Sequence, residues 1–212
     1  MPEPSRPEGD MQMSDLIDRY LKVTTCQVSD ALHASGLYAL GLVGIAPLDP
    51  ARRVAGPALP VSFSQEPGAE ERRIEYLERV TPGDVLVIAN GRMDCSCWGG
   101  QRSIRAIRRG AVATIVDGSY RDVEEHQAVG YPVWGRGRAV AGSRHAGAPV
   151  SAGETVRIGQ CAISRGDVVL ADASGVVVVP AAAAAEVLAR AETLAAAEAE
   201  VSAAAGRVTR KR

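Results

Sequence analysis

Near the start of the chain, the apolar residues recur at the spacing of an α-helix. Residues 13–22 (MSDLIDRYLK) place apolar side chains on one helical face, which predicts an amphipathic helix. The apolar positions are Leu16, Ile17, Tyr20 and Leu21. A second helix is predicted after Thr24, because Thr24 and Gln27 fit an S/T-x-x-Q capping box and Gly36 suits the stop.

The next stretch is punctuated by glycine and proline. Residues 37–68 contain short apolar pieces between these residues, which predict strands and turns. Residues 68–80 (GAEERRIEYLERV) then return to helical spacing, and they predict a third helix with Ile74, Leu77 and Val80 as its buried stripe.

The middle of the chain alternates apolar strands with helices, and its last third is mostly strand. The predicted elements are a strand at 85–89, a helix from Gly99 or Gly100 to Gly110, a strand in 111–119, a short helix ending at Gly130, a strand in YPVWGRG, an antiparallel region over 148–180 and a helix after Pro180 that runs to about Ala205. We therefore predict a single α/β domain over residues 13–205, with mixed sheets and helical N- and C-terminal ends. Residues 1–12 read as a disordered lead-in and residues 206–212 as a basic tail.

Charge and hydropathy narrow the function classes. The net charge is −1, which predicts no nucleic-acid-binding surface and no polybasic membrane patch. No apolar stretch approaches the roughly 20 residues that span a bilayer. The start of the chain is rich in proline and glutamate and has no apolar signal-peptide core, so we expect a cytoplasmic protein.

The chemistry-bearing residue types argue against two enzyme classes. The four cysteines form no CxxC pair and are expected to be reduced thiols, and the three histidines stand in no HxxxH or HExxH frame, which argues against a zinc enzyme. The lysines are Lys22 and Lys211 alone. A Schiff-base enzyme needs a lysine desolvated in a pocket, and neither position suits one. If the protein acts on a carbonyl group, a metal ion is the expected electrophile.

Two loops that follow predicted strands carry candidate chemistry. In WGGQRS (98–103) a glycine pair opens a helix, whose free N–H groups and dipole would favour a carboxylate or phosphate. Tight packing of the glycines is the alternative explanation.

The second loop lies in IVDGSYRDVEEH (115–126). Asp122 offers a hard oxygen ligand for Mg²⁺ or Mn²⁺, and Arg121 offers a planar set of donors for an anionic substrate. Glu125 lies on the same helical face as Asp122 and would hold a metal-bound water. The alternative is a solvated helix start with acidic residues near its dipole. His126 is expected to be exposed on this helix.

Taken in order, several motifs resemble the RraA-like family. They are VSDALHASG, TPGDVLVIANG, the helix from Gly99 to Gly110, TIVDGSYRDVEE, GYPVWGRG and GDVVLADASGVVVVP. The resemblance runs from about residue 24 to residue 190, and DG-x-x-RD followed by G-[YF]-P-V is its specific part. It implies a swivelling β/β/α-type domain that assembles as homotrimers or hexamers with sites between subunits. The family includes 4-hydroxy-4-methyl-2-oxoglutarate aldolases with oxaloacetate decarboxylase activity, and regulators of ribonuclease activity.

The resemblance also implies roles for individual residues. Asp122 would be the metal ligand, Glu125 would stand behind it, and Arg121 would contact the substrate. The N–H groups of five residues would cradle the pyruvyl carboxylate: Gly99, Gly100, Gln101, Arg102 and Ser103. The implied reaction is metal-dependent cleavage of a small 2-oxo acid, by retro-aldol cleavage or β-decarboxylation, through a metal-stabilised pyruvate enolate.

The chain departs from the family pattern at two positions. The family motif has a glycine, five residues, an aspartate, twenty residues and then Arg-Asp, whereas this chain has Asp94 at the glycine position and Gly100 at the aspartate position. Asp94 could supply the missing carboxylate from another direction. The missing acid leaves two alternatives open: a non-catalytic regulator that binds a ribonuclease or helicase, and a related enzyme of a specialised pathway that acts on another oxo acid.

Overall fold

The computed structural model describes residues 12–38, 40–142, 144 and 146–209. The helices are α1 (Met13–Tyr20), α2 (Thr25–Ala34), η1 (Tyr76–Arg79), α3 (Gly100–Arg109), α4 (Val123–Val129), η3 (Ala181–Ala183) and α5 (Ala184–Thr209). The strands are β1 (Ala46–Pro47), β2 (Val54–Ser64), β3 (Val85–Ala89), β4 (Ser96–Trp98), β5 (Ala113–Tyr120), β6 (Val133–Arg138), β7 (Ala148–Ala152), β8 (Val156–Ile158), β9 (Cys161–Ile163), β10 (Val168–Asp172) and β11 (Gly175–Val179).

One mixed sheet of nine strands organises the domain. Its order is β1-β6-β5-β3-β2-β10-β11, with β4 also paired to β5 and β7 to β2. The pairs β2–β3, β3–β5, β4–β5 and β5–β6 are parallel, and the remaining pairs are antiparallel. Strands β8 and β9 form a separate hairpin. The predicted single α/β domain with mixed sheets and helical ends is confirmed.

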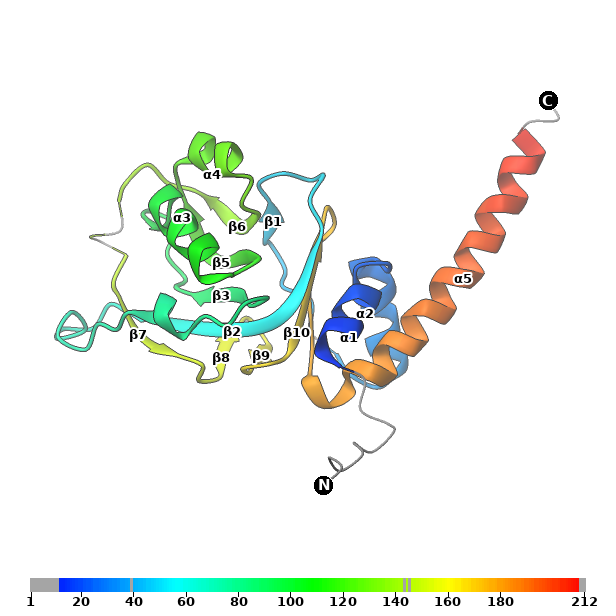
Figure 1. The fold of residues 1–212 in the computed structure, drawn as a ribbon, viewed down its shortest axis with the longest axis horizontal. Coiled ribbons are helices and arrows are strands. Elements are labelled where there is room, and N and C mark those ends of the chain that lie inside the picture. The colour runs from blue at the N-terminus through cyan, green and yellow to red at the C-terminus, as the bar shows by residue number, and fades with distance from the viewer. Residues whose placement is uncertain (1–11, 39, 143, 145, 210–212) are drawn as a thin grey trace, which may run out of the picture.

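The long strand β2 connects the two ends of the molecule, and it curves across the view in Figure 1. Its first residues pair with β10, its middle pairs with β3, and its last residues pair with β7. Seven of its eleven residues are buried, and they include consecutive residues whose side chains lie on opposite faces, as expected for a strand covered on two sides.

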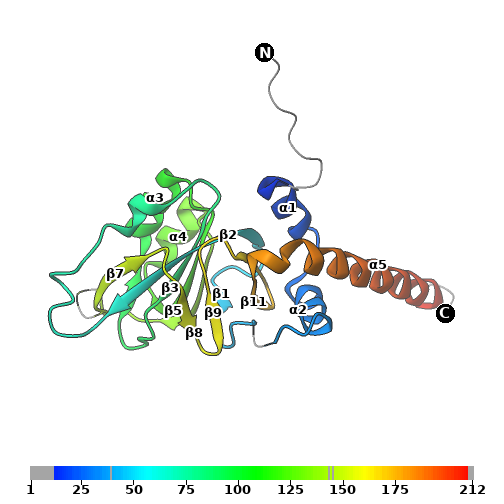
Figure 2. The same cartoon turned by 90° about the horizontal axis from the view of Figure 1, so that it is seen from below.

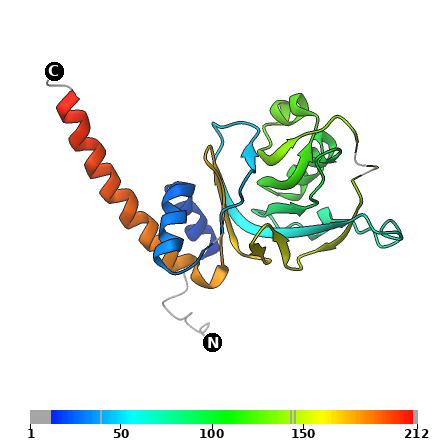
Figure 3. The same cartoon turned by 180° about the vertical axis from the view of Figure 1, so that it is seen from behind.

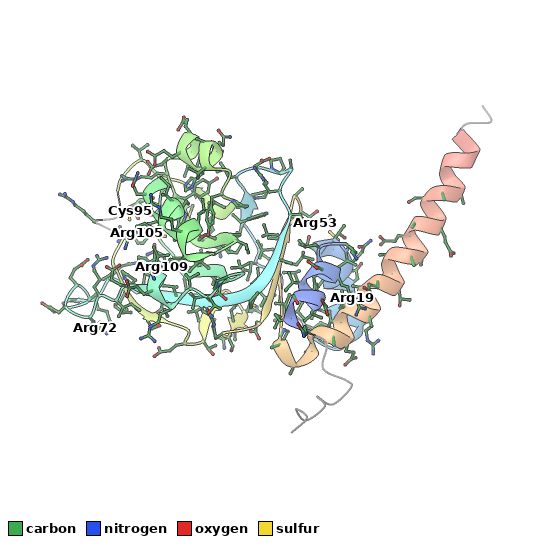
Figure 4. The ribbon with its side chains drawn as sticks, viewed as in Figure 1. Arg19, Arg53, Arg72, Cys95, Arg105 and Arg109 are labelled. Atoms are coloured by element: carbon green, nitrogen blue, oxygen red, sulfur yellow. The ribbon has the colours of Figure 1, made fainter. Side chains whose placement is uncertain are left out.

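The helices form two separate groups. Helices α3 and α4 cover the parallel part of the sheet, whereas α1, α2 and the start of α5 pack on β10 and β11 at the other end (Figures 1 and 3). In Figure 4, Cys95, Arg105 and Arg109 lie in the half that carries α3, and Arg19 lies beside α5. There Arg19 pairs with Glu192 at 2.5 Å.

Helix α5 extends away from the sheet (Figure 2), and it continues to Thr209 rather than ending near Ala205. Part of the predicted basic tail is therefore helical. Residues 210–212 and most of the predicted lead-in, residues 1–11, lie outside the described residues. Within the described part of the chain, no helix has the length and apolar character needed to cross a membrane.

The predicted third helix over residues 68–80 is wrong. The structure has turns in this segment and only the short η1 at its end. The backbone N–H of Ile74 donates to the carbonyl of Pro149 at 2.9 Å, which ties the segment to β7. Tyr76 and Leu77 are both buried, although adjacent residues would face different directions on an α-helix. Tertiary packing therefore overrides the local helical pattern.

The first two helices form as predicted. Thr24 accepts a hydrogen bond from the backbone of Gln27 at 3.2 Å, and the Gln27 side chain accepts one from the Thr24 N–H at 2.9 Å. Gly36 follows α2 with a φ of 74°, a conformation that glycine adopts without strain. All four cysteines are free.

Candidate active site

Two loops leave the sheet side by side at the carboxyl ends of parallel strands. Trp98, the last residue of β4, is aligned with Tyr120, the last residue of β5. Helix α3 begins two residues after Trp98, and α4 begins three residues after Tyr120. The N-termini of the two helices therefore meet at the carboxyl ends of the parallel strands. Open α/β sheets bind ligands at this end of their strands.

Asp122 has an unusual backbone. It is the N-cap of α4 and, among the described residues, the one non-glycine residue with positive φ, at 60°. Aspartate tolerates this left-handed region better than most residues, but the conformation still costs of order 1–3 kcal/mol. Such strain persists only where the surrounding contacts hold the backbone in place.

The Asp122 carboxylate is held from two directions. Its Oδ2 accepts a hydrogen bond from the N–H of Gly100 at 3.1 Å and lies 3.5 Å from the Arg121 Nε. The side chains of Asp122 and Arg121 keep 31% and 43% of their surface exposed. The site therefore joins a carboxylate, a guanidinium and the start of α3 at an edge that is open to solvent.

The glycine pair allows this close approach. A Cβ at Gly99 would lie 2.5 Å from Asp122 Oδ2, and a Cβ at Gly100 would overlap the Glu125 carboxylate and lie 2.6 Å from the Glu125 Cβ. Both contacts are too short for real side chains. Tight packing, the alternative explanation for the glycines, is thus part of the structure, and it is this packing that brings Asp122 to the helix start.

The predicted N–H cradle is only partly available. The N–H groups of Arg102 and Ser103 both bond to the carbonyl of Gly99, at 3.0 and 3.2 Å, and the N–H of Gly100 bonds to Asp122. In the described part of the chain, this leaves the N–H groups of Gly99 and Gln101 open for an incoming carboxylate.

The side chains of the same loop point in different directions. Arg102 donates to the carbonyl of Cys97 and lies over the Phe63 ring, with 5.8 Å between its guanidinium carbon and the ring centroid. Its guanidinium therefore interacts with groups on the side of α3 that faces β2. Gln101 is exposed at the start of the helix. Asp94, the proposed replacement for the missing acid, pairs with Arg92.

His126 is buried, so the expectation that it is exposed was wrong. It has 0% exposure, its Nδ1 lies 2.9 Å from Ser103 Oγ, and its Nε2 lies 2.8 Å from the carbonyl oxygen of Arg121. The sequence did not predict the burial of His126, because its acidic neighbours on α4 are typical of a solvent-exposed helix. The signal that was available is its spacing from Asp122, one helical turn further along the same face.

Burial also affects the ionisation of His126. Desolvation lowers the pKa of His126 below its ordinary value, although the hydrogen bond to the Arg121 carbonyl and the charges of Asp122 and Glu125 oppose the shift. The neutral imidazole is therefore favoured in the folded protein.

This shift predicts a loss of stability in mild acid. Below about pH 6.5 the unfolded chain binds a proton at His126 that the folded chain does not, so the free energy of unfolding falls as the pH falls toward the lower, folded-state pKa. Urea unfolding in the presence of a chelator measures the slope. His126→Gln removes the titrating group and should flatten the slope below about pH 6.5; an unchanged slope would show that other groups cause it.

The carboxylates at this site can be set against the ligands that a divalent cation requires. Among the described residues, no three His, Cys, Asp or Glu side chains converge to form a metal cage. Mg²⁺ and Mn²⁺ do not need one, since one or two carboxylates and several waters suffice. The contacts of Asp122 are at Oδ2, so Oδ1 remains open within the described structure, and Glu125 stands one helical turn away. These residues fit such an ion.

A lysine-based site does not fit the geometry. Lys22 is exposed in the turn after α1, which lies at the other end of the molecule from α3 and α4 (Figure 1). Lys211 lies outside the described residues. Within the described residues, therefore, no lysine is at this edge of the sheet.

Comparison with known proteins identifies the family. The family model described as RraA-like, Aldolase/RraA, matches residues 25–178. Protein DlpA of Legionella pneumophila is 30% identical over 172 residues, which are 79% of this chain but only 28% of DlpA. A protein of Halalkalibacterium halodurans, provisionally named a 4-hydroxy-4-methyl-2-oxoglutarate aldolase, is 30% identical over 78% of this chain and 77% of its own length.

A solved structure shares the fold. Streptomyces coelicolor RraAS2, described as an unusual member of the RNase ES inhibitor RraA protein family, has a TM-score of 0.80 and 29% identity, over 93% of this chain and 98% of its own. The family model, which matches more than half of the chain, and these relatives show that the chain belongs to the RraA-like (Aldolase/RraA) family.

Proposed function

We propose that the protein is a divalent-cation-dependent lyase of small 2-oxo acids. It would release pyruvate by retro-aldol cleavage of a 4-hydroxy-2-oxo acid, by decarboxylation of oxaloacetate, or by both. The observation that carries this proposal is the Asp122 carboxylate, which the Gly100 N–H holds beside the Arg121 guanidinium with one oxygen open. The related protein named as an aldolase supports the reaction class.

The substrate carboxylate would bind where positive groups converge. The N–H groups of Gly99 and Gln101 lie at the start of α3, where the helix dipole favours an anion. The Arg121 guanidinium faces the same edge and can bind a carboxylate through two of its N–H groups. These groups would fix the orientation of the 2-oxo acid.

Asp122 would hold the cation, Mg²⁺ or Mn²⁺. A divalent ion bound there would supply positive charge beside the keto oxygen, where negative charge develops as the C–C bond breaks. Glu125 is exposed, and its carboxylate lies over Gly100. We assign it the proton exchange: it accepts the proton of the substrate hydroxyl as the bond breaks, and it returns a proton to the pyruvyl carbon.

Assembly and location are also proposed. The open position of Arg121 and Asp122 suits a site that a neighbouring subunit completes, as in the homotrimer or hexamer that the family resemblance implies. A cytoplasmic location remains a prediction from composition.

The activity can be tested directly. Pyruvate release by the 212-residue chain is measured through coupled NADH oxidation, with oxaloacetate and a panel of 4-hydroxy-2-oxo acids. Turnover should require Mg²⁺ or Mn²⁺, stop with EDTA and return with excess metal. Metal without protein is the control for spontaneous decarboxylation. No turnover with any substrate at saturating metal would contradict the proposal, and co-purification with a ribonuclease or helicase would then favour the regulator.

A further inference from the structure

The backbone of the Arg121–Asp122 turn is anchored by Trp98 and His126. The N–H of Arg121 donates to the carbonyl of Trp98 at 3.0 Å. The backbone N–H of His126 donates to the carbonyl of Asp122 at 3.1 Å, and its ring Nε2 lies 2.8 Å from the carbonyl of Arg121. A single residue, His126, thus contacts the carbonyl groups of both residues of the turn.

The side chains behind the turn form a connected relay. The Trp98 Nε1 donates to Ser103 Oγ at 2.8 Å, and Ser103 Oγ lies 2.9 Å from the His126 Nδ1. Indole can only donate and a carbonyl can only accept, so the proton positions follow for a neutral imidazole. Ser103 accepts from Trp98 and donates to Nδ1, and the His126 Nε2–H donates to the carbonyl of Arg121. Every polar group of the relay then has a partner.

The relay is shielded from solvent. Trp98 is 1% exposed, and Ser103 and His126 are both 0% exposed. The three residues come from β4, α3 and α4, so their hydrogen bonds connect the elements that meet at the site. Their burial also argues against a nucleophilic Ser–His pair, because no substrate could reach the Ser103 hydroxyl. These three residues can therefore affect the site only through their contact with the strained Arg121–Asp122 turn.

We propose that Trp98, Ser103 and His126 are positioning residues, and that their relay holds the Arg121–Asp122 turn in the geometry that binds the cation. The inference rests on the proposed function for its consequence. Loss of the Nε2 donor would leave the part-buried Arg121 carbonyl without this partner, and the left-handed turn would lose one of its restraints. The Asp122 carboxylate would then sample positions away from the start of α3.

The test compares two substitutions of His126 in the 212-residue chain. His126→Leu removes both ring nitrogens, whereas His126→Gln retains an N–H donor near the position of Nε2. Loss of a residue that orients a metal ligand typically costs about 10–100-fold in affinity. We therefore expect His126→Leu to weaken Mn²⁺ binding, measured by electron paramagnetic resonance of the free ion, by about tenfold or more. His126→Gln should recover most of that affinity.

A matched control separates positioning from general stability. Tyr131→Phe removes another buried hydrogen bond, between Tyr131 and Thr114 at 3.0 Å, which does not contact the turn. It should lower the melting temperature and leave Mn²⁺ affinity unchanged. Equal weakening by Tyr131→Phe and His126→Leu, or wild-type affinity in folded His126→Leu, would overturn the proposal.

A second measurement does not depend on the cation. Amide hydrogen exchange across residues 119–126 should accelerate in His126→Leu and in Ser103→Ala, and less in His126→Gln and Tyr131→Phe. If the wild-type protein binds no Mn²⁺, the proposed function fails while exchange still reports on the relay. Unchanged exchange in His126→Leu and Ser103→Ala would overturn the relay itself, whatever the metal result.

Discussion

Replacing Asp122 with asparagine is expected to lower metal-dependent pyruvate release by more than about 100-fold, since the loss of a residue that only supports a metal ligand already costs roughly 10–100-fold. The amide has no negative charge, so it is a poor ligand for a hard divalent cation. Mn²⁺ affinity should fall with the activity. The coupled pyruvate assay and Mn²⁺ binding measure the two effects.

Asparagine is the sharper choice here because it preserves the backbone. Asparagine and aspartate are both enriched in the left-handed region, and the amide oxygen can still accept the Gly100 N–H. The fold should therefore persist. Glu124→Gln is the matched control, since it removes one negative charge from an exposed position of the same helix. Asp122→Asn with wild-type turnover, or Glu124→Gln with an equal loss, would show that Asp122 is not the ligand.

Replacing Gly100 with alanine is expected to destabilise the protein and to displace Glu125. The added Cβ would overlap the Glu125 carboxylate and lie 2.6 Å from the Glu125 Cβ, so rotation of the Glu125 side chain alone cannot relieve the contact. Overpacking of this kind costs about 1–3 kcal/mol, and the better helix propensity of alanine returns up to about 1 kcal/mol. Urea unfolding should show the net loss in the free energy of unfolding. The coupled pyruvate assay should show a lower turnover.

Substitutions at Glu125 separate the two parts of this contact. Glu125→Ala in the Gly100→Ala background removes the carboxylate overlap but keeps the Cβ contact, whereas Glu125→Gly removes both. The free energy of unfolding lost in Gly100→Ala should be recovered more fully by Glu125→Gly than by Glu125→Ala. The comparison subtracts the effect that each Glu125 substitution has by itself, which includes its helix propensity. Gly41→Ala is the control, because a Cβ there meets nothing within 4 Å. A Gly100→Ala protein as stable as this control would refute the steric account.

The same geometry bears on the departure of this chain from the family pattern at position 100, because the resemblance implies acids at positions 100 and 125 and this chain has only Glu125. The resemblance places an acid there, but Glu125 occupies the space that any side chain at Gly100 would need. The carboxylate that lies against Gly100 thus comes from α4 rather than from α3. This supports the assignment of proton exchange to Glu125 in the proposed reaction.

Local signals in the sequence determined most of the elements. The capping box at Thr24, the glycine stops at Gly36 and Gly110, and the apolar runs of β3 and β5 act over a few residues, so a linear pattern is sufficient to reveal them. The motif DG-x-x-RD likewise placed Arg121 and Asp122 directly after a buried strand, and the structure has them there. Their chemical roles remain proposals.

Only the tertiary structure decided the features that depend on distant partners. Residues 68–80 have a helical pattern, but the bond from Ile74 to Pro149 and the burial of Tyr76 and Leu77 hold them in turns. His126 has acidic neighbours in sequence, yet Ser103 and the Arg121 carbonyl surround it in space. Ser103 and Pro149 are far in sequence from the residues they contact, so a pattern read over one or two helical turns does not reveal these partners or the burial that they cause.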